Sequence, residues 1–299
     1  MTLLALLLAL LLERLATRLL HLRQAGWIED YAGWAAGKFV AAGGPAGMAS
    51  CVALALIPVV PVAAVALALA RAAPGIVWLG FASLVLIFSL GPRDLAEEVS
   101  DYLDCETGGD AAGAALAASA IIEHDAAQRR ELRAAAVEDA IFVQANNRIF
   151  GVLFWFVVLG PTGLGPAAAW LFRVSDLIRR RAIAGADPSA TAGGPGCPER
   201  LHFVLAWAPA RLLALGYALA GSFEDARRSW RERYSGFPAR LLERNDWLLV
   251  HVGRAAISTA IGGAADPSAP ARAAMRLVRR ALLFWVTIIA LLSLAAWIA

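Results

Sequence analysis

Two short stretches of this 299-residue chain hold the polar side chains whose types and spacing could do chemistry. The first is Asn146-Asn147-Arg148, which directly precedes an apolar run that begins near Phe150. The second contains Arg173 and Asp176, which follow the end of the same apolar region. Residues three apart share one face of a helix, so Arg173 and Asp176 are expected to pair.

A third arginine, Arg211, lies in the middle of the apolar stretch 201–220. A guanidinium group in such surroundings is costly unless it meets a carboxylate, a carbonyl or a phosphate. Its expected partner is Asp176, Asp246 or an anionic ligand. If the arginines converge, they could hold an anion by charge-assisted hydrogen bonds. The candidate polar or anion site is Asn146, Asn147, Arg148, Arg173, Asp176 and Arg211.

Each of these residues also has a purely structural interpretation. Asn146 and Asn147 could cap a helix end, and Arg148 could extend to lipid phosphates. The four histidines share no spacing with one another, and His202 is expected to have no special role. No nucleophile motif, Walker A loop or metal-ligand spacing is present, so we expect no catalytic residue, no metal and no cofactor.

The elements that position these residues are expected to be membrane helices. The chain is 60% hydrophobic, with a mean hydropathy of +0.63 and a net charge of +3. Its apolar residues form long charge-free runs, and a helix needs roughly 20 of them to cross a bilayer. The prediction is an all-α polytopic membrane protein with four or five transmembrane helices. Lipid is the expected surrounding, and no basic cluster interleaved with aromatics suggests nucleic acid.

The runs predict an order of segments along the chain. Pro58 and Pro61 should kink the span at 48–70. The glycines and prolines of 160–166 should break the segment 150–172, which either crosses the membrane or re-enters it. Arginines flank residues 173–280 and place that region in the cytoplasm. The predicted segments are 1–92 with three membrane helices, the helical polar region 93–148, the broken segment 149–172, the helical cytoplasmic region 173–280 with an apolar helix at 201–220, and the last membrane helix at 281–299.

Several motifs resemble those of one family of membrane proteins. The first runs from Asn146 through Phe154 and Trp155 to Asp176, and the second begins Trp207-Ala208-Pro209-Ala210-Arg211. With Trp230 and the opening Met1-Thr2-Leu3, they occur in an order and spacing that resemble AmpE. AmpE is in turn similar to CobD and CbiB, which join an aminopropanol unit to a corrinoid. The family-motif residues expected to pack are Phe154, Trp155, Trp207, Pro209 and Trp230.

The AmpE resemblance implies a regulatory or signalling protein of the bacterial inner membrane, linked to β-lactamase induction and cell-wall stress. A cell-wall recycling protein or an anionic small molecule is the implied partner. The alternative is an enzyme of the CobD/CbiB synthase type. The stretch Val143–Arg148 lacks the carboxylates that such chemistry would need for a cation or a proton transfer. We therefore favour the non-catalytic interpretation.

Overall fold

The computed structural model describes residues 26–39, 44–90, 95–123, 129–185, 196–234, 245–261 and 268–298. The predicted first span at residues 1–22 lies outside these ranges. Within them every regular element is helical, which confirms the all-α prediction. The helices form two compact units. Unit 1 comprises Met1–Pro92 and Asn147–Ala206, and unit 2 comprises Arg93–Asn146 and Trp207–Ala299.

Three helices of the described residues are long and apolar enough to cross a membrane. They lie within Gly75–Thr107, Arg130–Val158 and Cys197–Ala220. The pair Gly47–Leu56 and Val59–Ala72 adds a fourth candidate span when it is counted as one, with a bend of 46°. The predicted kink is thus present, and Pro58 stands at it, directly before the second helix. The predicted last span falls on α14, whose side chains beyond residue 292 lie outside the described set.

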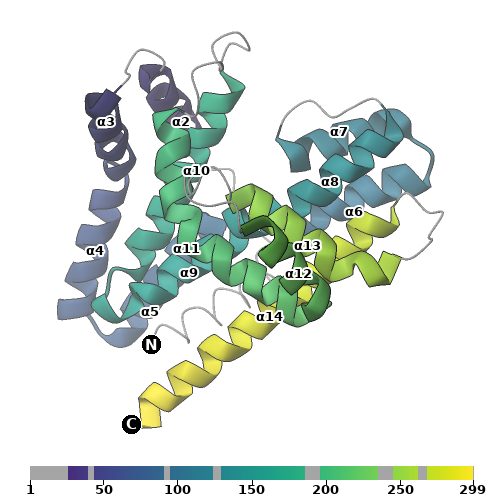
Figure 1. Cartoon of the computed structure of the whole chain (residues 1–299). Coiled ribbons are helices and arrows are strands. Elements are labelled where there is room, and N and C mark those ends of the chain that lie inside the picture. The colour runs from purple at the N-terminus through teal and green to yellow at the C-terminus, as the bar shows by residue number, and fades with distance from the viewer. Residues whose placement is uncertain are drawn as a thin grey trace. The chain divides into compact units, whose positions relative to one another are not determined.

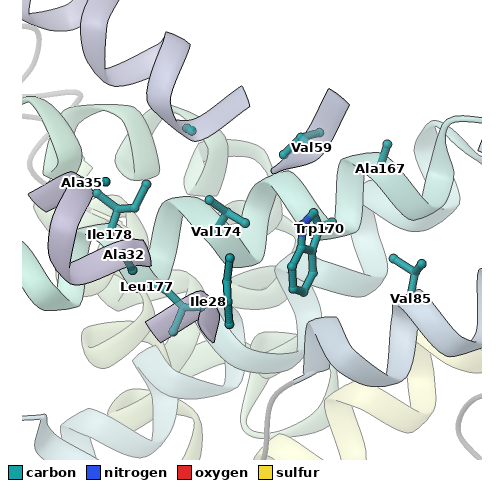
Figure 2. Close-up of a cluster of buried hydrophobic side chains, with 11 residues drawn as sticks. Ile28, Ala32, Ala35, Val59, Val85, Ala167, Trp170, Val174, Leu177 and Ile178 are labelled. Carbon is teal, nitrogen blue, oxygen red and sulfur yellow. The ribbon is translucent and has the colours of Figure 1, made fainter. Parts of the chain in front are cut away.

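Unit 1 is organised around α10, which contacts α2, α4, α5 and α9 (Figure 1). One face of α10 is apolar because Trp170, Val174 and Ile178 recur at helical spacing. Figure 2 shows these side chains with Ile28 and Val59 in a buried cluster. The helices of unit 1 are α2 (Gly26–Phe39), α3 (Gly44–Leu56), α4 (Val59–Ala72), α5 (Gly75–Leu90), α9 (Gly151–Val158), α10 (Gly165–Ala184) and the first part of α11 (Cys197–Ala220).

The Gly/Pro break predicted in 150–172 is present as a tight turn between α9 and α10. A 3-10 turn at Gly160–Thr162 ends at Gly163, whose φ of +80° lies in the left-handed region that favours glycine. Gly165 follows, and a Cβ there would lie 2.5 Å from the carbonyl oxygen of Phe156. The two helices therefore fold back on each other as a closely packed hairpin.

Unit 2 packs its helices around buried aromatic side chains. The rings of Phe142 and Tyr217 meet edge to face at 5.3 Å, and the Tyr217 hydroxyl donates to the Phe142 carbonyl oxygen at 3.1 Å. Helices α6, α7 and α8 follow one another and pack together (Figure 1). The helices of unit 2 are α6 (Leu95–Thr107), α7 (Ala111–Ile122), α8 (Arg130–Gln144), the rest of α11, α12 (Phe223–Tyr234), α13 (Asn245–Ile261) and α14 (Ala269–Ile298).

Candidate functional site

The densest group of charges in unit 1 surrounds Asp176 of α10. Its carboxylate is fully buried and accepts hydrogen bonds from Arg179 at 2.7 Å and from Arg180 at 2.8 Å. Arg173 approaches the same carboxylate at 3.5 Å, which confirms the predicted pair. All three arginines come from the helix that carries Asp176, at positions three before, three after and four after it.

The second face of α10 explains why this carboxylate is buried. Phe172 and Ala169 pack there against α5 and α9 in a second apolar cluster, which also holds Ala206 of α11. Asp176 lies four residues after Phe172 and so continues the same face. This face of α10 is therefore apolar up to Phe172, and one turn later it carries a carboxylate surrounded by guanidinium groups.

Two further residues complete the cluster, and their sequence positions gave no sign of it. The Nε2 atom of His202, on α11, lies 3.7 Å from Asp176 Oδ1. Its Nδ1 atom is 3.0 Å from the Ser175 hydroxyl, which also donates to the Phe172 carbonyl oxygen at 2.7 Å. Sequence analysis did not place His202 or Ser175 beside Asp176. A contact between residues 27 apart depends on packing, and no spacing rule reveals it.

The electrostatics of the cluster favour an ionised Asp176. Burial by itself raises the pKa of this carboxyl, but the guanidinium groups of Arg180 and Arg179 outweigh burial and hold the pKa well below its usual range. An ionised carboxylate that accepts from several arginines is a poor proton acceptor. The cluster therefore suits binding and positioning better than acid–base chemistry.

The predicted polar stretch before Phe150 forms a π-helix, Ala145–Phe150, inside the candidate span Arg130–Val158. Asn146, Asn147 and Arg148 are all buried there. π-helical turns are rare and recur at functional sites. Buried polar groups within a membrane helix are likewise costly and usually functional. Asn146 closes the first stretch of unit 2, whereas Asn147 and Arg148 begin the second stretch of unit 1.

The α9–α10 hairpin brings part of this stretch to the level of Asp176. Gly151 lies directly against the ring of Phe172, which a side chain at this position would overlap. The two helices of the hairpin run antiparallel. The residue three positions before Gly151 therefore lies at about the same height along the hairpin as the residue three positions after Phe172. This register places Arg148 roughly level with Ser175. Asn147, Arg148, Arg173 and Asp176 of the predicted site therefore lie toward the same end of the hairpin.

The remaining member of the predicted site, Arg211, lies in unit 2. Its guanidinium group donates to Asn245 Oδ1 at 2.9 Å and to the Trp207 carbonyl oxygen at 2.8 Å. The same group covers the Trp207 ring at 4.1 Å from the ring centre. Asn245 was not among the partners expected for Arg211. It meets Arg211 from α13, 34 residues along the chain.

Two residues of the predicted packing motifs are linked through one carbonyl group. Pro209 lies inside α11 and has no N–H, so the carbonyl of Leu205 loses its usual helical donor. The indole N–H of Trp155 donates to that oxygen at 3.0 Å. Trp155 therefore satisfies the acceptor that Pro209 leaves open. Phe154 meets the Trp155 ring edge to face, Pro209 is buried, Trp230 is half-buried on α12, and Trp207 is exposed.

A second buried carboxylate, Glu106 of α6, lies in unit 2. It accepts from Arg130 at 2.6 Å and from Arg133 at 3.0 Å, both on α8. Glu106 and Arg133 are buried, whereas the Arg130 side chain is 55% exposed. Sequence analysis did not identify this group because its members are 24 and 27 residues apart. Among the described residues, no set of His, Cys, Asp and Glu side chains is arranged to hold a metal ion.

Apolar candidate spans, a Gly/Pro-broken hairpin and buried charges within helices define an α-helical membrane protein. The chain matches the family described as regulatory signalling modulator protein AmpE over residues 1–298. It belongs to the AmpE family.

Curated relatives carry a different description. The chain is 29% identical over 194 residues to the cobalamin biosynthesis protein CobD of Stutzerimonas stutzeri (strain A1501), covering 64% of this chain and 60% of that protein. It is 26% identical over 182 residues to CobD of Chromobacterium violaceum, covering 60% of this chain and 55% of that protein. The chain thus spans less than two thirds of either relative. No solved structure matches it.

Proposed function

We propose that this protein is a non-catalytic regulatory protein of the bacterial inner membrane that acts in β-lactamase induction and the response to cell-wall stress. Membership of the AmpE family over nearly the whole chain supports a regulatory role. The observation that carries the non-catalytic part is the state of Asp176. Its carboxylate is fully buried and bonded to arginines of its own helix, so it is occupied as an acceptor.

A deletion strain tests this proposal. β-Lactamase activity would be measured with a chromogenic substrate before and after exposure to several β-lactam inducers. The expected result is a changed induction ratio that returns to the wild-type value when the full chain is supplied on a plasmid. Unchanged induction and unchanged susceptibility across all inducers would contradict the regulatory role.

The second candidate function is that of a cobalamin-biosynthesis enzyme, and the two CobD relatives favour it. Its test is to supply the gene to a bacterium that lacks its own CobD and to measure cobalamin-dependent growth. Growth on the precursor would support the enzyme and remove the non-catalytic part of the main proposal. Failure of a chain that is present in the membrane, as shown by immunoblot, would support the regulator.

A further inference from the structure

The exposed face of α14 carries three arginines before its apolar half. Arg276, Arg279 and Arg280 are exposed, and their spacing of three and four places them on one side of the helix. The opposite side is buried at Val278 and Ala281, and α14 packs against α8 and α13. The packing of α14 within unit 2 therefore leaves the three guanidinium groups on its outer face.

A contact on the buried side fixes which face of α14 is exposed. The indole N–H of Trp285 donates to the Leu212 carbonyl oxygen of α11 at 3.1 Å. A Cβ at Gly216 would lie 2.6 Å from the same indole nitrogen, so the two helices approach closely at this point. Trp285 lies on the same side of α14 as Val278 and Ala281, because it follows them by two turns and one turn. The contact with α11 therefore sets the rotation of α14 within unit 2.

The charges of these arginines are not balanced by the part of the chain that the structure describes. The side chains of Arg276, Arg279 and Arg280 form no ion pair or hydrogen bond with any described residue. Another exposed arginine of unit 2 has such a partner, since Arg254 lies 2.7 Å from the Asp139 carboxylate. The positive charge on the outer face of α14 is thus available to an external anion.

The same face becomes apolar directly after the arginines. Leu283 is 66% exposed and Phe284 is 36% exposed, and Leu291 is 61% exposed two turns after Phe284. Exposed apolar side chains that form a continuous surface mark a contact with lipid or with another protein. The face therefore presents three positive charges and then apolar side chains, which is the order of parts in a phospholipid, an anionic phosphate followed by acyl chains.

Charge complementarity favours an anionic lipid as the occupant of this face. Guanidinium groups donate charge-assisted hydrogen bonds to phosphate oxygens. Each arginine near an anionic membrane surface contributes about a fivefold gain in affinity. A nucleic acid would also supply phosphates, but it would leave the apolar side chains of the face in water. An anionic phospholipid satisfies both halves of the face at once.

We propose that Arg276, Arg279 and Arg280 bind the headgroup of an anionic phospholipid, whose acyl chains lie along Leu283 and Leu291. This inference goes beyond the proposed regulatory function and does not depend on it, because a regulator and an enzyme would each use such a site to hold α14 at the membrane surface. The arginines provide the preference for negative charge, and the apolar side chains provide contact with any phospholipid.

The test is a titration of the purified full chain in detergent with phosphatidylglycerol, followed by native mass spectrometry. Phosphatidylcholine with the same acyl chains is the neutral comparison. Wild-type protein is expected to bind phosphatidylglycerol more tightly. The double variant Arg279→Gln/Arg280→Gln is expected to weaken phosphatidylglycerol binding about 25-fold, which is about fivefold for each arginine. Its binding of phosphatidylcholine is expected to change little, because the apolar side chains remain.

The matched control is Arg227→Gln/Arg228→Gln on α12. These two arginines are also adjacent in sequence and exposed, and their replacement removes the same charge from unit 2. This control is expected to keep the preference of the wild type. A further variant, Arg279→Lys/Arg280→Lys, keeps both charges and is expected to keep most of the preference, which separates the loss of charge from the loss of the arginine side chains themselves.

A competition experiment distinguishes a lipid from a soluble anion. Glycerol phosphate has the phosphate but no acyl chains, and it is expected not to displace phosphatidylglycerol from the wild type at equal concentration. Displacement would assign the arginines to a soluble phosphate compound and would overturn the proposal.

Three further results would overturn it. The first is that wild type binds phosphatidylglycerol and phosphatidylcholine alike. The second is that the α14 and α12 double glutamine variants bind phosphatidylglycerol equally. The third is that the lysine variant, with unchanged helical circular dichroism, loses the preference as fully as the glutamine variant does. None of these results bears on the induction phenotype of the deletion strain, so the regulatory proposal stands or fails separately.

Discussion

Asp176 and Glu106 are both buried carboxylates held by arginines, yet they are built in opposite ways. The arginines of Asp176 lie within four residues on the same helix. Those of Glu106 lie on another helix, 24 and 27 residues away. The Glu106 group links α6 to α8, and its Arg130 side chain is largely exposed to solvent. The Asp176 group gathers its three arginines within two turns of one helix, and their side chains are 20% exposed or less.

The largest effect is expected from removing the negative charge of Asp176. Asp176→Asn leaves three guanidinium groups without their carboxylate, and breaking a buried charge pair costs about 3–5 kcal/mol. Glu106→Gln leaves one buried arginine, Arg133, and should cost less. The measurement is the unfolding midpoint of each purified variant in detergent. A larger loss for Glu106→Gln would reverse the ranking of the two clusters.

The next largest effect is the difference in stability lost when each of the two arginine partners of Glu106 is replaced. Arg133→Gln removes the buried partner and is expected to cost about 3 kcal/mol. Arg130→Gln removes a partner that is more than half exposed, and should cost about 1 kcal/mol or less because water screens the pair. Denaturant titration of both variants, followed by tryptophan fluorescence, measures the difference. Equal losses would show that exposure does not set the strength of this cluster.

A smaller effect tests whether unit 1 also depends on polar contacts between helices. Trp155→Phe removes the donor to the Leu205 carbonyl and should cost about 1–3 kcal/mol, as expected for a buried acceptor left without a partner. Pro209→Ala restores an N–H that can reach the same oxygen. The cost of Trp155→Phe should therefore be lower in the Pro209→Ala background, which a double-mutant cycle measures. Strict additivity would show that the two residues act independently.

The smallest effect is expected from pH between 8 and 5. The folded-state pKa of Asp176 lies below its unfolded value of about 3.9, so its contribution to stability is fully present above that unfolded value. The contribution is lost as pH falls toward the folded-state pKa. The stability difference between wild type and Asp176→Asn should stay constant down to pH 5 and shrink below about pH 4. A decline that begins near pH 6 would place the pKa above its usual range.

The sequence by itself determined the features that depend on neighbouring residues. The apolar runs predicted a helical membrane protein, Pro58 predicted a bend, and the glycines and prolines of 160–166 predicted a break in the segment 150–172. The Arg173–Asp176 pair followed from a separation of three, because helix geometry alone places such residues on one face.

Only the tertiary structure decided which distant groups meet. His202 reaches Asp176, Arg133 reaches Glu106, and Arg211 meets Asn245. These contacts depend on how the apolar faces of helices pack, and each joins residues at least 26 positions apart. A helix fixes the relative positions of residues within a few turns, whereas the partner across an interface is set by the packing of side chains from several helices at once.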